Sequence, residues 1–322
     1  MNYQEIRGLV DHQFDNVNTV ILDHLDSSVP LINEVGAYII KSGGKRLRPL
    51  VCLLSANALQ YKGDIHIKVA AITEFLHTAT LLHDDVVDES ALRRGQSTVN
   101  EVWGNATSIL VGDYLISKSF QMIVQINHLR LMEIIAEATA VITEGEVLQL
   151  INIHNPDTSQ DHYMDIIRSK TAKMFEVAAQ SGAILANAPQ EQEQAMVDYA
   201  RHMGAAFQLI DDVLDYTGSA DALGKNVGDD LAEGKPTLPL IYAQKHCSEN
   251  ERSMIQNAIK HGGLDNLDEI IAAVISSGGI EYTIKAAEQE ADKAIQALEV
   301  IPDSIYRTAM MDLARLAVNR NT

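Results

Sequence analysis

Apolar residues recur three or four positions apart along almost the whole chain, which is the spacing of one face of an α-helix. Glycine, asparagine and proline interrupt the pattern, for example at Gly43-Gly44, Gly262-Gly263 and Gly278-Gly279. The pattern therefore predicts helices joined by short connections. One of the predicted helices is short and covers 97–104. The longer predicted helices cover about 3–26, 31–41, 47–60, 65–88, 108–127, 129–153, 160–183, 191–217, 236–247, 250–261, 266–276, 280–299 and 303–319.

Several of these predicted helices, including 65–88, 108–127 and 191–217, are apolar on most of their circumference. A helix of that kind is normally buried among other helices. The longest irregular stretch covers 217–237, and a loop of that length in a compact helical protein usually has a function. We therefore expect an all-α fold, a large helical bundle with a central layer, as a single domain over 1–322.

Composition supports helices, because 46% of the 322 residues are hydrophobic, only 5% are aromatic, and no alternating β-branched pattern occurs. The net charge of −19 argues against a basic nucleic-acid-binding surface and a polybasic membrane anchor. Cys52 and Cys247 match no zinc or redox spacing and indicate reduced thiols.

The N-terminal stretch is mixed and acidic, unlike a signal peptide. No uncharged apolar run reaches the roughly 18 residues of a spanning helix. We expect a cytoplasmic protein without stable membrane insertion.

Two short acidic motifs end predicted apolar helices: LLHDDVVDES contains Asp84, Asp85 and Asp88, and FQLIDDVLDYT contains Asp211, Asp212 and Asp215. Residues four apart lie on the same helix face, so the first and third aspartates of each motif are aligned and the middle one lies beside them. The first face continues back through Thr80 and His77, and the second through Gln208 and Gly204.

Burying these carboxylates without a positive partner would cost several kcal/mol each. No lysine or arginine lies on either face, whereas Mg²⁺ prefers carboxylate, water and phosphate oxygens. One such motif could equally be a solvated acidic helix end, but two copies behind apolar helices favour two metal-binding faces around one diphosphate.

Short basic motifs complement the acidic ones. KSGGKRLRP places Lys45, Arg46 and Arg48 after two glycines, which let a backbone approach an anion closely. The other basic residues are Arg93 and Arg94 in LRRGQST, Lys170 and Lys173 beside Thr171 in RSKTAKMF, and Lys225 and Lys235 in the long loop. Arginine forks suit phosphate oxygens, so acidic and basic motifs together predict phosphorylated ligands. We interpret His77 as a phosphate contact, and His83 and His154 as structural.

These motifs, GGKRLRP, LLHDDVVDES with RRG, SKTA, FQLIDDVLDY and GKNVGDDLAEGKPTLPL, resemble those of the trans-isoprenyl diphosphate synthases nearly end to end. The resemblance implies an isoprenoid-synthase-type bundle around a central apolar tunnel, a homodimer, and about three Mg²⁺ ions per substrate-loaded active site. It implies metal ligation by Asp84 and Asp88 on one side and Asp211 and Asp215 on the other. Asp85, Asp212 and Lys170 are implied as further catalytic residues.

The resemblance also implies two substrate sites. Isopentenyl diphosphate would be bound by Lys45, Arg48, His77 and Arg94. The allylic diphosphate would be bound by Arg93, Lys170, Thr171, Gln208, Lys225 and Lys235.

An allylic diphosphate reacts by separating into a cation and pyrophosphate, so cationic groups on the leaving group and exclusion of water are what the chemistry requires. In the family an aromatic residue at the position of Ala79, five before Asp84, stops chain growth early, so alanine there predicts a long-chain product. Leu76, Met122, Ile123, Met132 and Ile135 are further candidates for the tunnel wall, although ordinary core packing explains such residues equally well.

The expected activity is sequential condensation onto farnesyl diphosphate to give octaprenyl diphosphate for a quinone side chain. Heptaprenyl or nonaprenyl products stay open. Each five-carbon unit adds several kcal/mol of apolar binding, so product release should limit turnover and involve transient membrane contact.

Three other readings remain. A class I terpene cyclase shares the first acidic motif but normally has an Asn/Ser/Glu triad in place of DDVLD, and it does not need GGKRLRP. A non-catalytic partner subunit would have damaged motifs, and none is damaged here. An acidic helical scaffold would not bind diphosphate with metal.

Overall fold

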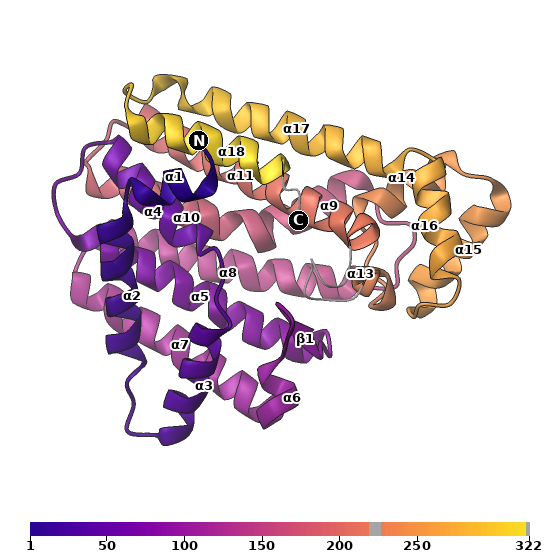
Figure 1. The fold of residues 1–322 in the computed structure, drawn as a ribbon, viewed down its shortest axis with the longest axis horizontal. Helices are drawn as coiled ribbons and strands as arrows, with labels where there is room; N and C mark the ends of the chain where they lie inside the picture. Colours follow the sequence, from indigo (N-terminus) through magenta and orange to yellow (C-terminus); the bar gives the residue numbers. More distant parts are fainter. Residues whose placement is uncertain (219–226, 320–322) are drawn as a thin grey trace. The chain divides into compact units, whose positions relative to one another are not determined.

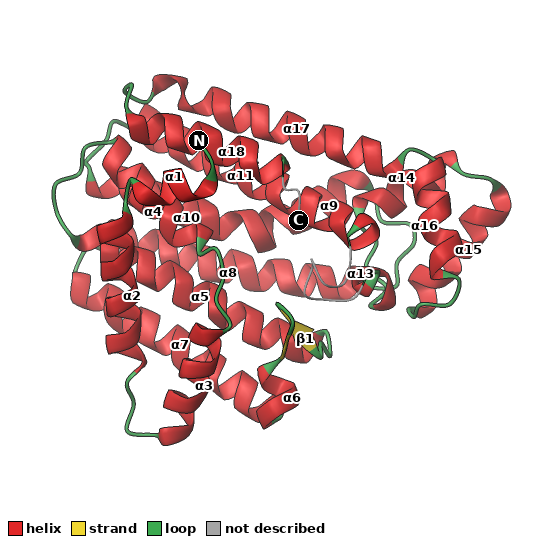
Figure 2. Cartoon of the chain, in the orientation of Figure 1, coloured by secondary structure: helices red, strands yellow, loops and turns green. Residues whose placement is uncertain are grey.

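The computed structural model describes residues 1–218 and 227–319, and the described chain is almost entirely helical (Figures 1 and 2). The all-α prediction is confirmed. The α-helices are α1 Tyr3–Gly8, α2 Asp11–Leu25, α3 Pro30–Lys41, α4 Leu47–Ala58, α5 Ile65–Val87, α6 Val99–Trp103, α7 Asn105–Ile126, α8 Leu129–Asn152, α9 Gln160–Ile167, α10 Lys173–Leu185, α11 Gln190–Thr217, α13 Asp229–Ala232, α14 Leu238–His246, α15 Glu249–His261, α16 Leu267–Ser276, α17 Gly279–Ala297 and α18 Ile305–Val318. A π-helical turn, η1 Arg168–Ala172, joins α9 to α10, and a 3₁₀ turn, η2 Leu298–Val300, follows α17.

The chain divides into two compact units. Unit 1 comprises 1–138, 174–200 and 297–313, and unit 2 comprises 139–173, 201–296 and 314–322. Helices α8, α11 and α18 contribute residues to both units. A single domain over 1–322 therefore stays a prediction, because compactness of the units does not establish that either folds alone.

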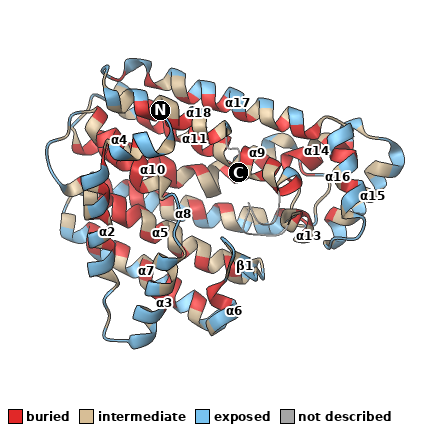
Figure 3. Ribbon diagram, in the orientation of Figure 1, coloured by how far each residue is buried: buried red, intermediate tan, exposed pale blue. Residues whose placement is uncertain are grey.

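Unit 1 is organised around α5, which packs against α7, α4 and α2. The apolar stretch of α5 is buried, including Ala70, Ala71 and Ala79, whose small side chains permit close helix approach. Burial extends over most of α4, as expected for a helix that is apolar on all sides (Figure 3). This packing fixes the C-terminal end of α5, where the first acidic motif lies.

Unit 2 contains two apolar clusters. One joins α11, α13, α14, α15 and α16 through residues such as Val213, Leu240 and Ile270, and the other joins α9, α11, α14 and α17 around Leu209 and Ile241. The second cluster includes Tyr163 of α9, which lies against the helix that carries the second acidic motif.

Besides the π-helical turn that interrupts the predicted helix 160–183, the structure differs from the predicted elements in three places. The predicted helix over 3–26 is broken at Leu9 and Val10, directly after Gly8, a residue that weakens helices.

A two-stranded hairpin, β1 Leu92–Arg93 and β2 Gln96–Ser97, was not predicted. Its turn residues Arg94 and Gly95 have φ values of 55° and 73°, and a two-residue hairpin turn with positive φ at both centres matches the right-handed twist of the strands. The third difference is α13, which lies in the stretch predicted to be irregular.

Within the described residues, no single helix has both the length and the apolar character needed to cross a membrane. One bent pair, Leu267–Ser276 with Gly279–Val300, meets the criterion at an angle of 61°.

Candidate active site

The first acidic motif closes α5. Asp85 is buried, with 3% of its surface exposed, whereas Asp84 and Asp88 are half-buried. The backbone N–H of Asp88 donates to the carbonyl of Asp84 at 2.7 Å, so helical geometry continues to the last aspartate. Asp84 and Asp88 therefore share a helix face, as the sequence predicted.

Arg93 supplies the positive partner of Asp85. Its Nε and Nη2 lie 2.8 and 2.6 Å from Asp85 Oδ1. No cation lies on this face of α5 itself, in agreement with the sequence, but the unpredicted hairpin brings one to it. Burial raises the pKa of Asp85, and the hydrogen bond from Arg93 opposes that rise.

Arg94, the next residue, points to the glycine-rich loop. Its Nη1 donates to the carbonyl of Gly43. A Cβ at Gly44 would collide with the Arg94 guanidinium, and Gly44 has a φ of 140°, a value that side chains disfavour. The second glycine of GGKRLRP is therefore required for this close approach.

The loop that follows is held from the N-terminal helices. The Tyr3 hydroxyl donates to the carbonyl of Lys45, and Arg46 Nη1 donates to Asn18 Oδ1. Arg46 adopts a left-handed conformation with φ 46° and ψ 52° immediately before α4. Arg48, in the first turn of α4, lies over the Phe175 ring with its guanidinium carbon 4.4 Å from the ring centre.

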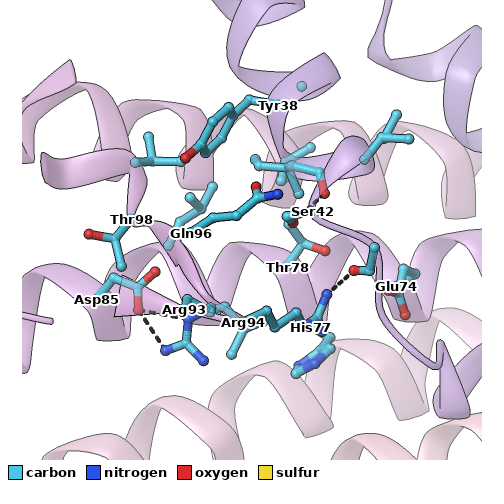
Figure 4. A pocket seen from close by; sticks show the side chains of 18 of the residues that line it. Tyr38, Ser42, Glu74, His77, Thr78, Asp85, Arg93, Arg94, Gln96 and Thr98 are labelled. Carbon is cyan, nitrogen blue, oxygen red and sulfur yellow. Dashed lines mark hydrogen bonds and ion pairs between the residues drawn. The ribbon is translucent and has the colours of Figure 1, made fainter. Parts of the chain in front are cut away.

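A cavity of about 80 Å³ lies between α5, α3 and the hairpin, and Figure 4 shows its polar side chains. His77, Arg93 and Arg94 line it, together with Glu74 and Asp85. Burial, followed by Arg48, Arg94 and Arg93, holds the pKa of His77 well below 6.5. His77 is therefore a neutral imidazole at physiological pH, able to donate one N–H to an anion without adding charge.

Glu74 was missed by sequence reasoning. Its Oε2 is buried and has no hydrogen-bond partner among the described residues. Burial raises the pKa of Glu74, while Arg48, Arg46 and Arg94 oppose the rise. Glu74 thus places a carboxyl group among the arginines, and its position three residues before His77 was the only signal in the sequence.

The candidate tunnel residues belong to α5, α7 and α8 of unit 1. Leu76, Ala79, Met122, Ile123 and Ile135 are buried, and Met132 is half-buried. Burial is common to a tunnel wall and to an ordinary core, so the tunnel stays a prediction.

The second acidic motif lies on α11 in unit 2. Asp212 and Asp215 are 3% and 0% exposed, and Asp211 is half-buried. Asp212 accepts from the Tyr163 hydroxyl at 2.5 Å and from Gln208 Nε2 at 2.8 Å. Asp215 Oδ2 accepts from the backbone N–H of Asp230 at 3.3 Å. Burial and the neighbouring Asp230 raise the pKa of Asp212.

The SKTA motif forms the π-helical turn η1, a local widening that is frequent at functional sites. Thr171 Oγ1 donates to Gln208 Oε1 at 3.0 Å, so this turn is joined to α11. Lys170 Nζ lies 2.6 Å from Glu146 Oε2, and Lys235 is paired with Glu233. Lys225 lies outside the described residues.

The donor set fits Mg²⁺. Within the described ranges there is no group of three or more His, Cys, Asp or Glu side chains that could by itself hold a metal ion. Mg²⁺ does not need such a cage, because it binds through one or two carboxylates and takes its remaining ligands from water and substrate phosphates. Asp84 with Asp88, and Asp211 with Asp215, offer such carboxylate pairs.

His83 and His154 have structural partners, as expected. His83 Nε2 lies 3.2 Å from the carbonyl of Ile109, and His154 Nδ1 lies 2.9 Å from that of Ile259. Both cysteines are free thiols, Cys52 buried and Cys247 half-buried.

Comparison with known proteins connects these features to one family. The family model described as polyprenyl synthetase matches residues 29–275. The octaprenyl diphosphate synthase of Escherichia coli (strain K12) is 50% identical over 322 residues, which is 100% of both chains. The all-trans-nonaprenyl-diphosphate synthase (geranyl-diphosphate specific) of Rhodobacter capsulatus is 47% identical and covers 98% of both chains.

The fold has a close counterpart among solved structures. The polyprenyl synthase from Caulobacter crescentus CB15, complexed with calcium and isoprenyl diphosphate, superposes with a TM-score of 0.96. It is 40% identical, and the match covers 100% of this chain and 98% of that one.

Proposed function

Because the chain belongs to the polyprenyl synthetase family and is a long-chain trans-polyprenyl prenyltransferase, we propose that it makes octaprenyl diphosphate from isopentenyl diphosphate and an allylic primer such as farnesyl diphosphate. The observation that carries the proposal is full-length 50% identity to an octaprenyl diphosphate synthase with both acidic and all basic motifs present. The nonaprenyl-producing relative makes nonaprenyl diphosphate the first alternative product.

The cations of unit 1 form the proposed site for the diphosphate of isopentenyl diphosphate. Lys45 and Arg48 belong to the loop and first turn of α4, and Arg94 is tied to that loop through Gly43. Neutral His77 adds a hydrogen-bond donor beside these charges. Positive charge together with a neutral hydrogen-bond donor suits a diphosphate, and arginine supplies paired donors for its oxygens.

We assign the acidic motifs and the remaining basic residues to the allylic diphosphate because the chain belongs to the polyprenyl synthetase family. Asp84, Asp88, Asp211 and Asp215 would hold Mg²⁺, which when bound withdraws charge from the leaving pyrophosphate. Arg93, Lys170, Lys225 and Lys235 would add positive charge at the same group, and Thr171 and Gln208 would orient it. These donors matter most as charge develops on the leaving oxygen, so they lower the barrier to ionisation.

The double bond of isopentenyl diphosphate then attacks the allylic cation, and the departing pyrophosphate takes the proton. Binding both substrates side by side converts a bimolecular reaction into a local one. The apolar helices of unit 1 would exclude water, which would otherwise convert the cation to an alcohol.

Ala79 supports a long product. It is fully buried on α5, five residues before Asp84, and its methyl group leaves more room than an aromatic ring. We expect Ala79→Phe to shorten the product, and Leu76, Met122, Ile123, Met132 and Ile135 to line the remainder of the tunnel. Chromatography of the products with a parallel melting curve separates a blocked tunnel from a misfolded protein.

A homodimer is the proposed assembly. Leu110 and Val124 of α7 and Leu129 of α8 are 66%, 56% and 71% exposed, and we propose that a second copy covers these apolar side chains. Sedimentation of the wild type and of L110E/V124E tests this, and an unchanged mass would contradict it.

We further propose a cytoplasmic location with transient membrane contact during product release.

The deciding experiment incubates the purified protein with farnesyl diphosphate, isopentenyl diphosphate and Mg²⁺. We expect octaprenyl diphosphate, a burst before slow turnover that detergent accelerates, and complete loss of activity with EDTA. A cyclised hydrocarbon, or no condensation at all, would contradict the proposal.

A further inference from the structure

Four side chains of unit 2 form a continuous chain of hydrogen bonds. The Tyr163 hydroxyl of α9 donates to Asp212 Oδ2 at 2.5 Å, and Gln208 Nε2 donates to Asp212 Oδ1 at 2.8 Å. Thr171 Oγ1 of the π-helical turn donates to Gln208 Oε1 at 3.0 Å. The chain therefore runs from α9 through α11 to the SKTA turn.

We propose that Tyr163 is a positioning residue for the allylic diphosphate, acting through Asp212 and Gln208 on Thr171. The inference rests on the proposed function, which assigns Gln208 and Thr171 to the allylic substrate. It adds a residue that none of the sequence motifs contains.

Asp212 is the centre of this arrangement. It is 3% exposed, and a carboxyl group buried to that extent requires hydrogen-bond partners. Tyr163 occupies one carboxylate oxygen, so the other faces Gln208. The middle aspartate of DDVLD thus binds side chains of the protein, in contrast to the metal role proposed for Asp211 and Asp215.

The contact with Asp212 fixes which way the Gln208 amide points. Its nitrogen faces the carboxylate, and its oxygen accepts from Thr171. The amide nitrogen has two hydrogens, of which Asp212 takes one, so the second can be donated to an anion. Removing the Tyr163 hydroxyl would release one side of Asp212, and with it the orientation of Gln208.

Tyr163 is suited to this task. Burial, followed by the charge of Asp212, raises the pKa of Tyr163 well above 10, so the phenol keeps its proton and acts as a permanent donor. The SKTA turn also lies close to α8, because a Cβ at Gly145 would be 2.8 Å from Ser169 Cβ and 3.2 Å from Lys170 N. Among the described side chains, Tyr163 and Gln208 are the ones that donate hydrogen bonds to Asp212.

The test is Tyr163→Phe, which removes one oxygen and keeps the ring. We expect the KM for farnesyl diphosphate to rise about tenfold, as for one lost hydrogen bond, and the KM for isopentenyl diphosphate to stay unchanged. Tyr199→Phe is the matched control, because its buried hydroxyl donates to the carbonyl of Met310 at 2.8 Å within unit 1. Tyr199→Phe should lower the melting temperature and leave both KM values unchanged.

A second variant tests the route. In Gln208→Ala, the added Tyr163→Phe change should have little further effect on the farnesyl diphosphate KM, because the path through Gln208 is already cut. Should Tyr163→Phe fail to fold, Asp212→Asn replaces it, since the amide keeps the shape but has one acceptor oxygen; an unchanged farnesyl diphosphate KM would then overturn the inference.

An equal rise of both KM values in Tyr163→Phe, or a loss of melting temperature with both unchanged, would overturn the inference while leaving the proposed function intact. Fully additive effects of the Tyr163 and Gln208 changes would also overturn it. Absence of condensation by the wild-type protein is a separate result that concerns the proposed function alone.

Discussion

Two nitrogens of Arg93 donate hydrogen bonds to the same carboxylate oxygen of Asp85, Nε at 2.8 Å and Nη2 at 2.6 Å. This contact joins the β1–β2 hairpin to the last turn of α5. Because Asp85 is buried next to Asp84 and Asp88, the guanidinium also compensates part of the repulsion among three like charges.

The fork predicts that lysine cannot replace Arg93. An ammonium is a single point charge and cannot reproduce the paired donors, so Arg93→Lys should lower the free energy of unfolding by about 1–2 kcal/mol. It should also raise the KM for the allylic diphosphate. Urea denaturation and steady-state kinetics measure the two effects.

Arg130→Lys provides the control for Arg93→Lys. Arg130 is 54% exposed and pairs with Glu133 and Glu193 at 3.6 and 3.3 Å. Exposed pairs of this kind contribute little, so the change should stay within about 0.5 kcal/mol. Equal effects of the two substitutions would show that the Asp85 contact has no special role.

Glu290 predicts a pH-dependent contribution to stability. Burial alone would raise its pKa, but hydrogen bonds from His202 at 2.6 Å and Lys293 at 2.7 Å outweigh burial and lower the pKa from 4.5 to about 2. A depressed carboxylate pKa stabilises the folded state above about pH 4.5, and this stabilisation is lost as the pH falls towards 2. Glu290→Gln should therefore cost roughly 2–3 kcal/mol at pH 7.

The measurement for Glu290 compares wild type and variant by urea denaturation at neutral pH and at successively lower pH. The difference between them should shrink once the pH falls below the unfolded-state value. A difference that stays constant over this range would mean that packing, and not charge, accounts for the effect.

His66 predicts sensitivity to mild acid. It is 2% exposed, its ring nitrogens have no hydrogen-bond partner among the described residues, and burial lowers its pKa below 6.5. Because the folded state disfavours the protonated ring, stability should fall as the pH drops below 6.5 and the unfolded chain takes up the proton. His66→Phe should lose less stability between neutral and mildly acidic pH, whereas the exposed His261→Gln should behave like the wild type.

Gly182 predicts a strong steric effect. A Cβ there would lie 2.5 Å from the backbone nitrogen of Ala56 and 2.6 Å from Ser55 Oγ, where α10 packs against α4. Backbone cannot move aside cheaply, so Gly182→Ala should destabilise the protein by about 1–3 kcal/mol or more. Gly8→Ala has open space around the new methyl group and should be neutral or stabilising. Similar melting temperatures for the two variants would contradict this reading of the packing.

Much of the helical architecture could be predicted, because a helix with one buried face has apolar residues that recur every three or four positions in the sequence. The ranges 65–88, 108–127 and 129–153 correspond to α5, α7 and α8 to within a few residues. The hairpin was missed because two-residue strands leave no period, although Arg94-Gly95 is compatible with its turn. The break after Gly8 was missed because the apolar pattern continues across it.

The candidate site was predictable where one helix carries all the information. Asp84 with Asp88, and Asp211 with Asp215, follow from the i, i+4 geometry of an α-helix. Glu74 and Tyr163 could not be identified in this way, because each gains its significance from side chains that are distant in the sequence.

The sequence by itself determined the helical fold class, the two acidic helix ends and the need for cations to accompany them, because periodicity and charge are properties of the chain read locally. The tertiary structure alone decided which cation meets which carboxylate: Arg93 pairs with Asp85, and Asp212 binds Tyr163 and Gln208. The physical reason is that a buried charge is compensated by whichever groups packing brings within hydrogen-bond distance, and spacing along the chain does not specify those groups.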